Sequence, residues 1–169
     1  MIESGFHDVP HGKLAVVVTH LEMDAKPSLR EVPLPEGVTF QKVTPTLDWF
    51  RDIFRRVGMD WLWYGRLKLD DAALTAVLQD PARAFYTLTR DGKDEALLEL
   101  MDQAITLAWE QPITRLHLHT CTNDSPQALG FYVRSGFTPV RRQVEIDDDP
   151  RLTGLLPRDA APQVPLIEG

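Results

Sequence analysis

Hydrophobic and polar residues along the chain follow two spacings, one typical of strands and one of helices. Residues 14–23 form a β-branched apolar run without Gly or Pro, and residues 38–43 alternate apolar and polar side chains. The same strand pattern returns in three later segments: 84–90, 115–120 and 137–146. The Asp91-Gly92 pair marks a turn after the first of these three.

Helical spacing fills the intervals between those strands. Thr46 is a plausible N-cap for an amphipathic helix that ends at Gly58, and Asp70 is a plausible N-cap for a second helix that ends before Pro81. A third helix is expected over 94–111, although residues 95–100 suit a strand equally well. A fourth is expected to begin at a Ser125 cap and to end at Gly136 in a left-handed C-terminal turn.

This order of elements predicts one α/β domain, with a mixed, mostly antiparallel sheet and helices on both of its faces. A length of 169 residues fits a single domain. We expect the domain to span residues 1–149 and a Pro-rich tail with little regular structure to span 150–169. The domain divides into three parts: an N-terminal strand at 14–23, a connector at 24–37 and a core at 38–146.

The charge and the chain start exclude several kinds of protein. The net charge of −7 repels phosphate backbones, so we expect no nucleic-acid partner. The first five residues lack the basic and apolar parts of a signal peptide, and the apolar run at 14–18 is far shorter than the roughly 20 residues of a membrane helix. We therefore expect no membrane association. The lone Cys121 cannot form an internal disulfide, which favours a reducing, cytoplasmic location.

The most informative segment is 116–137, which reads as a strand, a polar turn and a short helix that ends in Gly-Phe. Its helix carries one compact pattern: Ala128-x-x-Phe131-Tyr132-x-x-x-Gly136-Phe137. Tyr132 follows Ala128 by four residues, so both lie on one helix face, which we expect to point toward the sheet. A phenol there can donate one proton and accept one hydrogen bond.

This pattern resembles the final motif of the GNAT superfamily of acyl-CoA-dependent N-acyltransferases. The resemblance covers residues 116–140 as a motif and residues 38–146 as an order of elements. It implies a GNAT-like fold. It also implies transfer of an acyl group, most simply from acetyl-CoA, to a small-molecule or peptide amine by direct attack and without a metal.

The resemblance also implies roles for individual residues. Tyr132 would protonate or hydrogen-bond the leaving thiolate, and a phenol with a pKa near 10 suits a thiol with a pKa of about 8.5. The alternative for Tyr132 is a buried aromatic residue whose hydroxyl is already bonded. Contacts to acetyl-CoA would come from the strand end and the helix: Thr120, Thr122, Asn123, Ala128 and Phe131. Asn123 could instead serve as the turn residue that starts the helix.

An aromatic segment, Trp61-Leu62-Trp63-Tyr64, lies where the family has its acceptor-site loop. We expect Trp61, Trp63 and Tyr64 to form a wall for an amine, including by cation–π contact. Packing in the core or in a homodimer is the alternative for these rings. An earlier basic stretch could hold a phosphate, or could simply be the solvated face of its helix: Arg51, Arg55 and Arg56.

One element of the family is missing from the sequence. The Gly-rich loop that cradles the CoA diphosphate has no counterpart, and a strand with its loop, about 25 residues, is absent near Leu100 and Met101. Three interpretations stay open. In the first, which we favour, the natural chain has further residues at this point. In the second the deletion is real, and in the third the protein resembles the family without belonging to it. A general base therefore cannot be assigned, and the nearest carboxylates, Glu95 and Glu99, suit a solvated surface.

Two rival functions follow from these residues. Without the diphosphate loop, the domain could be a GNAT-like binding or interaction module that does not catalyse. His117, His119 and Cys121 alternate along one strand face, which is compatible with a zinc site or a thiol nucleophile, although no fourth ligand is evident. Polar and thiol packing is the simpler explanation of that face.

Overall fold

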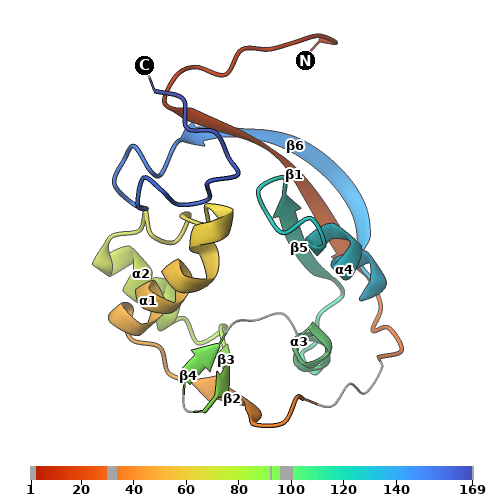
Figure 1. Cartoon of the computed structure of the whole chain (residues 1–169). Helices are drawn as coiled ribbons and strands as arrows, with labels where there is room; N and C mark the ends of the chain where they lie inside the picture. The colour runs from red at the N-terminus through yellow and green to blue at the C-terminus, as the bar shows by residue number, and fades with distance from the viewer. Residues whose placement is uncertain (1–2, 30–33, 92, 96–100, 169) are drawn as a thin grey trace.

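The computed structural model describes residues 3–29, 34–91, 93–95 and 101–168, and of residues 93–95, 102 and 103 it describes the backbone alone. Helices and strands alternate within the described part of the chain, and the predicted α/β class is confirmed (Figure 1). The strands are β1 (Lys13–Met23), β2 (Val38–Val43), β3 (Phe85–Arg90), β4 (Lys93–Glu95), β5 (Leu116–Cys121) and β6 (Thr138–Asp148). The helices are α1 (Leu47–Gly58), the short 3₁₀ helix η1 (Met59–Trp61), α2 (Asp71–Leu78), α3 (Met101–Trp109) and α4 (Ala128–Arg134).

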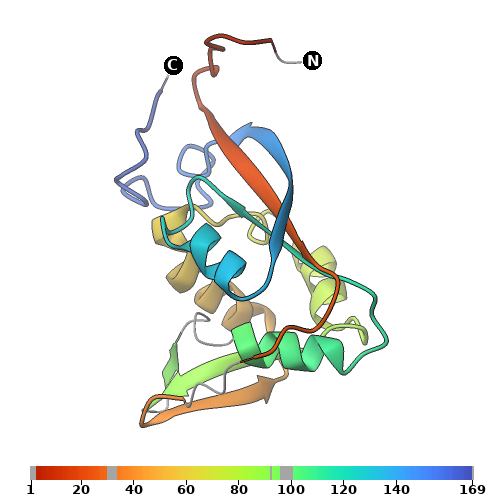
Figure 2. The ribbon, with the colours of Figure 1, turned by 90° about the vertical axis from the view of Figure 1, so that its right-hand side faces the viewer.

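The described strands form two antiparallel three-stranded sheets rather than one. In the first sheet, β1 lies between β5 and β6, so the N-terminal strand is central although it comes first in the chain. Val18 pairs with Cys121 on one side and with Gln143 on the other. Figure 2 shows β1 and β6 as a long twisted pair above the other elements. The β-branched run of β1 suits this central position because both of its edges are paired.

The second sheet has the order β2-β3-β4 and lies at the opposite end of the molecule (Figures 1 and 2). Residues 91–92 connect β3 to β4, and Asp91 has a φ of 50°, as a tight hairpin turn requires. The expectation of a helix from residue 94 is wrong, because residues 93–95 pair with β3. The spacing of apolar residues fits a helix and a strand equally well here. Pairing with β3 stabilises the strand.

Helix capping agrees with the sequence for two helices and differs for one. The Thr46 and Asp70 side chains accept hydrogen bonds from the third residue after each, at 3.2 Å and 2.7 Å, and so begin α1 and α2. Ser125 does not cap α4, which begins at Ala128, although the Ser125 carbonyl accepts from the Ala128 amide at 2.8 Å. Gly136 ends this helix with a φ of 103°, as predicted.

Two hydrophobic clusters hold the elements together. One gathers Leu21, Met23, Ile105 and Phe137 beneath α3 and α4, with Tyr132 packed against it. The other joins the η1 region to the C-terminal segment through five buried residues: Leu62, Leu67, Leu156, Ala160 and Ala161.

The segment 150–164, expected to be part of a tail, has turns but no helix or strand, and it contributes to this second cluster. A buried ion pair holds it in place, because the Arg151 guanidinium donates to the Asp149 carboxylate at 2.7 Å and 3.0 Å. The same guanidinium donates to the Val164 and Ala160 carbonyls, at 2.8 Å and 3.3 Å, and so closes the turns around itself.

Within the described residues, no helix combines the length and apolar character needed to cross a bilayer.

Candidate functional site

Tyr132 lies on α4 and packs toward the first sheet, as its spacing predicts. Its ring makes edge contacts with Phe131 and Phe137, with centroids 5.6 Å and 6.4 Å apart. The side chain is half-buried, and among the described residues none hydrogen-bonds its hydroxyl. Burial raises the pKa of Tyr132, and the negative charge of Asp124 raises it further, so the phenol is protonated at neutral pH. Leu129 of the same helix is 42% exposed.

Asp124 is the hydrogen-bonding centre of the turn between β5 and α4. Its carboxylate accepts from the Thr120 hydroxyl at 2.5 Å, from the Cys121 amide at 2.8 Å and from the Trp63 indole N–H at 2.7 Å. The first two bonds fix the end of β5, and the third ties the aromatic segment to that end. Since Asp124 also acts on Tyr132 electrostatically, it links the α4 phenol to the aromatic segment.

The aromatic segment lies against the end of the first sheet, and the polar atoms of Trp63 and Tyr64 are already engaged there. The Tyr64 hydroxyl donates to the Asp147 carboxylate at 3.0 Å, and Lys68 also pairs with Asp147. The Lys68 ammonium lies 4.9 Å from the centre of the Tyr64 ring, so this ring already carries a cation. Trp61 is half-buried in η1. The Trp63 ring is therefore the part of the segment best placed to contact a further molecule.

The residues expected to contact acetyl-CoA divide into two groups. Thr120 is buried and bonded to Asp124, and Thr122 accepts from the Val17 amide at 3.1 Å, so both hydroxyls serve the sheet. Asn123 is half-buried in the turn, and within the described part of the chain its carboxamide has no partner. Ala128 and Phe131 are half-buried on α4.

The His and Cys residues of β5 do not form a metal-binding cluster. His117 and His119 are exposed, and the His119 ring lies 5.9 Å from the ring of His20 on β1. In the described residues, no group of three or more His, Cys, Asp or Glu side chains is arranged to hold a metal ion. Burial raises the pKa of the Cys121 thiol, which disfavours the thiolate that a nucleophile requires.

The arginines of α1 are either ion-paired or exposed, and they do not gather around a common site. Arg51 pairs with Asp71 at 2.7 Å, Arg56 pairs with Asp52 at 2.9 Å, and Arg55 is exposed.

The junction between Leu100 and Met101 lies outside the described residues, as do Glu99 and the side chain of Glu95. The structure therefore does not choose between further residues, an internal deletion and an unrelated protein as the reason for the missing loop.

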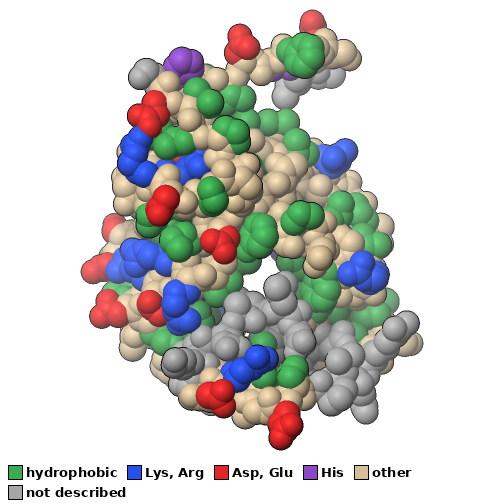
Figure 3. All heavy atoms as spheres, viewed as in Figure 1, with side chains coloured by type: hydrophobic (Ala, Val, Ile, Leu, Met, Phe, Trp, Pro, Cys, Tyr) green, Lys and Arg blue, Asp and Glu red, His purple; other side chains and the backbone are tan. Residues whose placement is uncertain are grey.

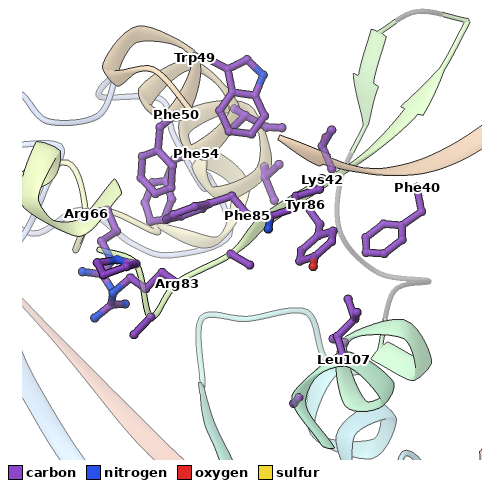
Figure 4. A pocket seen from close by; sticks show the side chains of 18 of the residues that line it. Phe40, Lys42, Trp49, Phe50, Phe54, Arg66, Arg83, Phe85, Tyr86 and Leu107 are labelled. Atoms are coloured by element: carbon purple, nitrogen blue, oxygen red, sulfur yellow. The ribbon is translucent and has the colours of Figure 1, made fainter. Parts of the chain in front are cut away.

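A cavity of about 830 Å³ lies between α1, the second sheet and α3 (Figure 4). Sequence reasoning did not find it, because its walls come from segments far apart in the chain. Trp63 lines the cavity, whereas Tyr132 does not. The signal available in the sequence was the density of aromatic residues in α1 and in β3.

Comparisons with known proteins identify no family: no protein-family model and no curated protein matches the chain. Among solved structures, a functionally unknown conserved protein from Staphylococcus epidermidis ATCC 12228 is similar at 13% identity, with a TM-score of 0.40. The match covers 82% of this chain and 63% of that one, so the chain spans less than two thirds of the length of that protein. A likeness at this level assigns no activity.

The three hydrogen bonds of Asp124 give the first prediction. In Asp124→Asn, an amide N–H₂ replaces one accepting oxygen and faces donors, so we expect the free energy of unfolding in urea to fall by about 1–3 kcal/mol. We also expect faster hydrogen exchange at the Trp63 indole. Asp52→Asn, which removes half of an exposed ion pair on α1, should cost about 0.5 kcal/mol or less. Equal losses in the two variants would show that Asp124 does not hold the turn.

Proposed function

We propose that the protein is an N-acyltransferase of the GNAT type, which transfers an acetyl or other acyl group from acyl-CoA to an amine. The observation that carries the proposal is the Tyr132 phenol, which is half-buried, protonated and without a described hydrogen-bond partner on the helix that follows β5. Figure 3 shows a hollow in the surface between the α1 side and the β5–α4 side of the molecule.

The proposed reaction needs no covalent enzyme intermediate. The lone pair of the neutral amine attacks the thioester carbonyl carbon, and the carbonyl π electrons move to oxygen. When this intermediate collapses, the C–S bond breaks and its electron pair leaves with sulfur. The Tyr132 hydroxyl donates to that sulfur, and the proton lost by the amine nitrogen restores the phenol through solvent. The raised pKa of Tyr132 keeps this donor protonated throughout the neutral range.

Two residues at the turn between β5 and α4, Asn123 in the turn and Trp63 bonded to it, support roles in binding. The Asn123 carboxamide has no described partner and offers both a donor and an acceptor, which suits the amide groups of a pantetheine arm. The Trp63 ring, held by Asp124 at the end of β5, could contact the acceptor amine through its face. The lone cysteine supports a cytoplasmic location, where acyl-CoA would be the co-substrate.

A second candidate function is a GNAT-like module that binds a partner without catalysis. The sequence between β4 and α3, residues 96–100, contains no glycine, whereas a backbone cradle for a diphosphate depends on glycine. This observation favours loss of CoA binding.

Release of free CoA thiol separates the two candidates. The wild-type protein is incubated with acetyl-CoA and a panel of small-molecule and peptide amines, and the thiol is followed with a chromogenic disulfide. The acyltransferase proposal predicts amine-dependent thiol release with an equal amount of acetylated amine in the mass spectrum. Thiol release no faster than in buffer, across the panel, would leave the binding module as the better account.

A further inference from the structure

We propose that the cavity between α1, the second sheet and α3 binds a small organic anion whose charged group is attached to an aromatic body. Seven aromatic residues among the described ones line this cavity, out of fourteen Phe, Trp and Tyr in the whole chain. Its volume of about 830 Å³ lies within the range of pockets that hold drug-sized molecules. The inference does not rest on acyl transfer, because Tyr132 is not part of the cavity.

The aromatic walls form two groups of rings. Phe50 stacks on Phe54 at 5.7 Å and meets the edge of Phe85 at 6.0 Å, while Phe40 stacks on Tyr86 at 4.9 Å on the second sheet. Figure 4 shows these groups on different walls of the same space. All five rings are half-buried rather than buried, so part of their apolar surface faces the cavity. Covering such surface is favourable by roughly 25 cal/mol per Å².

The charged residues in the cavity walls indicate the sign of the charge that a ligand would carry. Among the described residues, three cations line it, Lys42, Arg66 and Arg83, and one acid, Glu110. Figure 4 shows the Arg66 and Arg83 side chains on the side of the cavity away from Phe40. Arg83 is paired with Asp80 at 3.0 Å.

Arg66 is the residue that most directly indicates an anion. Its side chain is half-buried, and it has neither an ion pair nor a hydrogen bond within the described part of the chain. No buried side-chain nitrogen among the described residues lacks a partner, so the unpaired Arg66 guanidinium stays open to solvent and to a ligand. A carboxylate or sulfonate can accept two parallel N–H bonds from it. The aromatic rings and Arg66 together therefore select a molecule with an apolar ring system and an anionic group.

Two dyes of similar ring structure test this inference. The probe is 1-anilinonaphthalene-8-sulfonate, and the matched neutral probe is N-phenyl-1-naphthylamine, which lacks the sulfonate. Calorimetry and dye fluorescence on the intact wild-type protein should give one-to-one binding of the sulfonate, tighter than the neutral probe. Arg66→Gln should weaken the sulfonate roughly tenfold and leave the neutral probe nearly unchanged, because one charge-assisted contact is lost.

Two further variants decide whether the dyes bind in this cavity. Arg55→Gln removes the same charge from an exposed position outside the cavity and should change neither affinity. Ala104→Trp places a large ring into the cavity from α3 and should weaken both probes. The inference is overturned if neither dye binds, if the two dyes bind equally well, if Arg66→Gln matches Arg55→Gln, or if Ala104→Trp has no effect.

Discussion

Replacement of Arg151 by Met is expected to lower the free energy of unfolding by about 3–5 kcal/mol, the largest stability effect we predict. The Arg151 and Asp149 side chains are 2% and 4% exposed, so the substitution leaves a carboxylate in the interior without its cation. It also removes the donors to the Val164 and Ala160 carbonyls. The measurement is equilibrium unfolding in urea at pH 7.

Arg158→Met is the matched control, because Arg158 pairs with Glu168 at the surface, where the two side chains are 59% and 55% exposed. Its cost should be about 0–1 kcal/mol. If Arg151→Met and Arg158→Met lose the same stability, the ion pair does not hold the C-terminal segment.

The same ion pair predicts a dependence on pH. Burial alone would raise the pKa of Asp149, but its hydrogen bonds and charge pairing with Arg151 outweigh burial and lower the pKa below the ordinary 3.8. A lowered folded-state pKa means that the pair stabilises the protein fully above the unfolded-state pKa and is lost as the pH falls through the folded value. In Arg151→Met burial acts without the opposing arginine, so the variant's Asp149 takes up its proton above the ordinary pKa. The stability difference between wild type and Arg151→Met should therefore be largest near pH 7 and shrink steadily as the pH falls toward about 4 and below.

Tyr132→Phe is expected to lower the rate of CoA thiol release at least about tenfold, with little change in acetyl-CoA affinity. The substitution keeps the ring contacts with Phe131 and Phe137 and removes the donor to the leaving sulfur. Because the pKa of Tyr132 is raised above 10.0, the wild-type rate should not fall on the alkaline side below about pH 10 through loss of this proton.

Unfolding in urea provides the control for Tyr132→Phe, since no described side chain bonds the hydroxyl and its removal should cost little stability. An unchanged rate in a folded variant would exclude the phenol as the acid. An equal loss of rate and of acetyl-CoA affinity would assign Tyr132 to binding instead.

Local features of the fold could be predicted from the sequence. The Thr46 and Asp70 caps, the strand at β1 and the left-handed Gly136 each depend on residues within a few positions of one another, and the structure confirms them. The acceptor role of the aromatic segment, which rests on the resemblance, stays a prediction, whereas its hydrogen bond from Trp63 to Asp124 could not be read from the sequence.

Features that depend on distant partners could not be predicted. Nothing within β1 says that it pairs with β5 and β6, because its apolar run suits any strand with two paired edges. In the sequence Asp124 is an ordinary turn residue. Its hydrogen bond from the indole of Trp63, 61 positions away, is formed only in the folded chain. The C-terminal segment reads as a tail because of its prolines, whereas the burial of Arg151 depends on carbonyls that only the folded turns bring together.

Calorimetric titration of the wild-type protein with acetyl-CoA tests the central claim most directly. An acyltransferase with its co-substrate site at the end of β5 should bind one acetyl-CoA per chain with micromolar affinity, and Asn123→Ala should weaken that binding. Absence of binding up to about 1 mM acetyl-CoA would contradict the account, because a chain that does not hold the thioester cannot place it beside Tyr132.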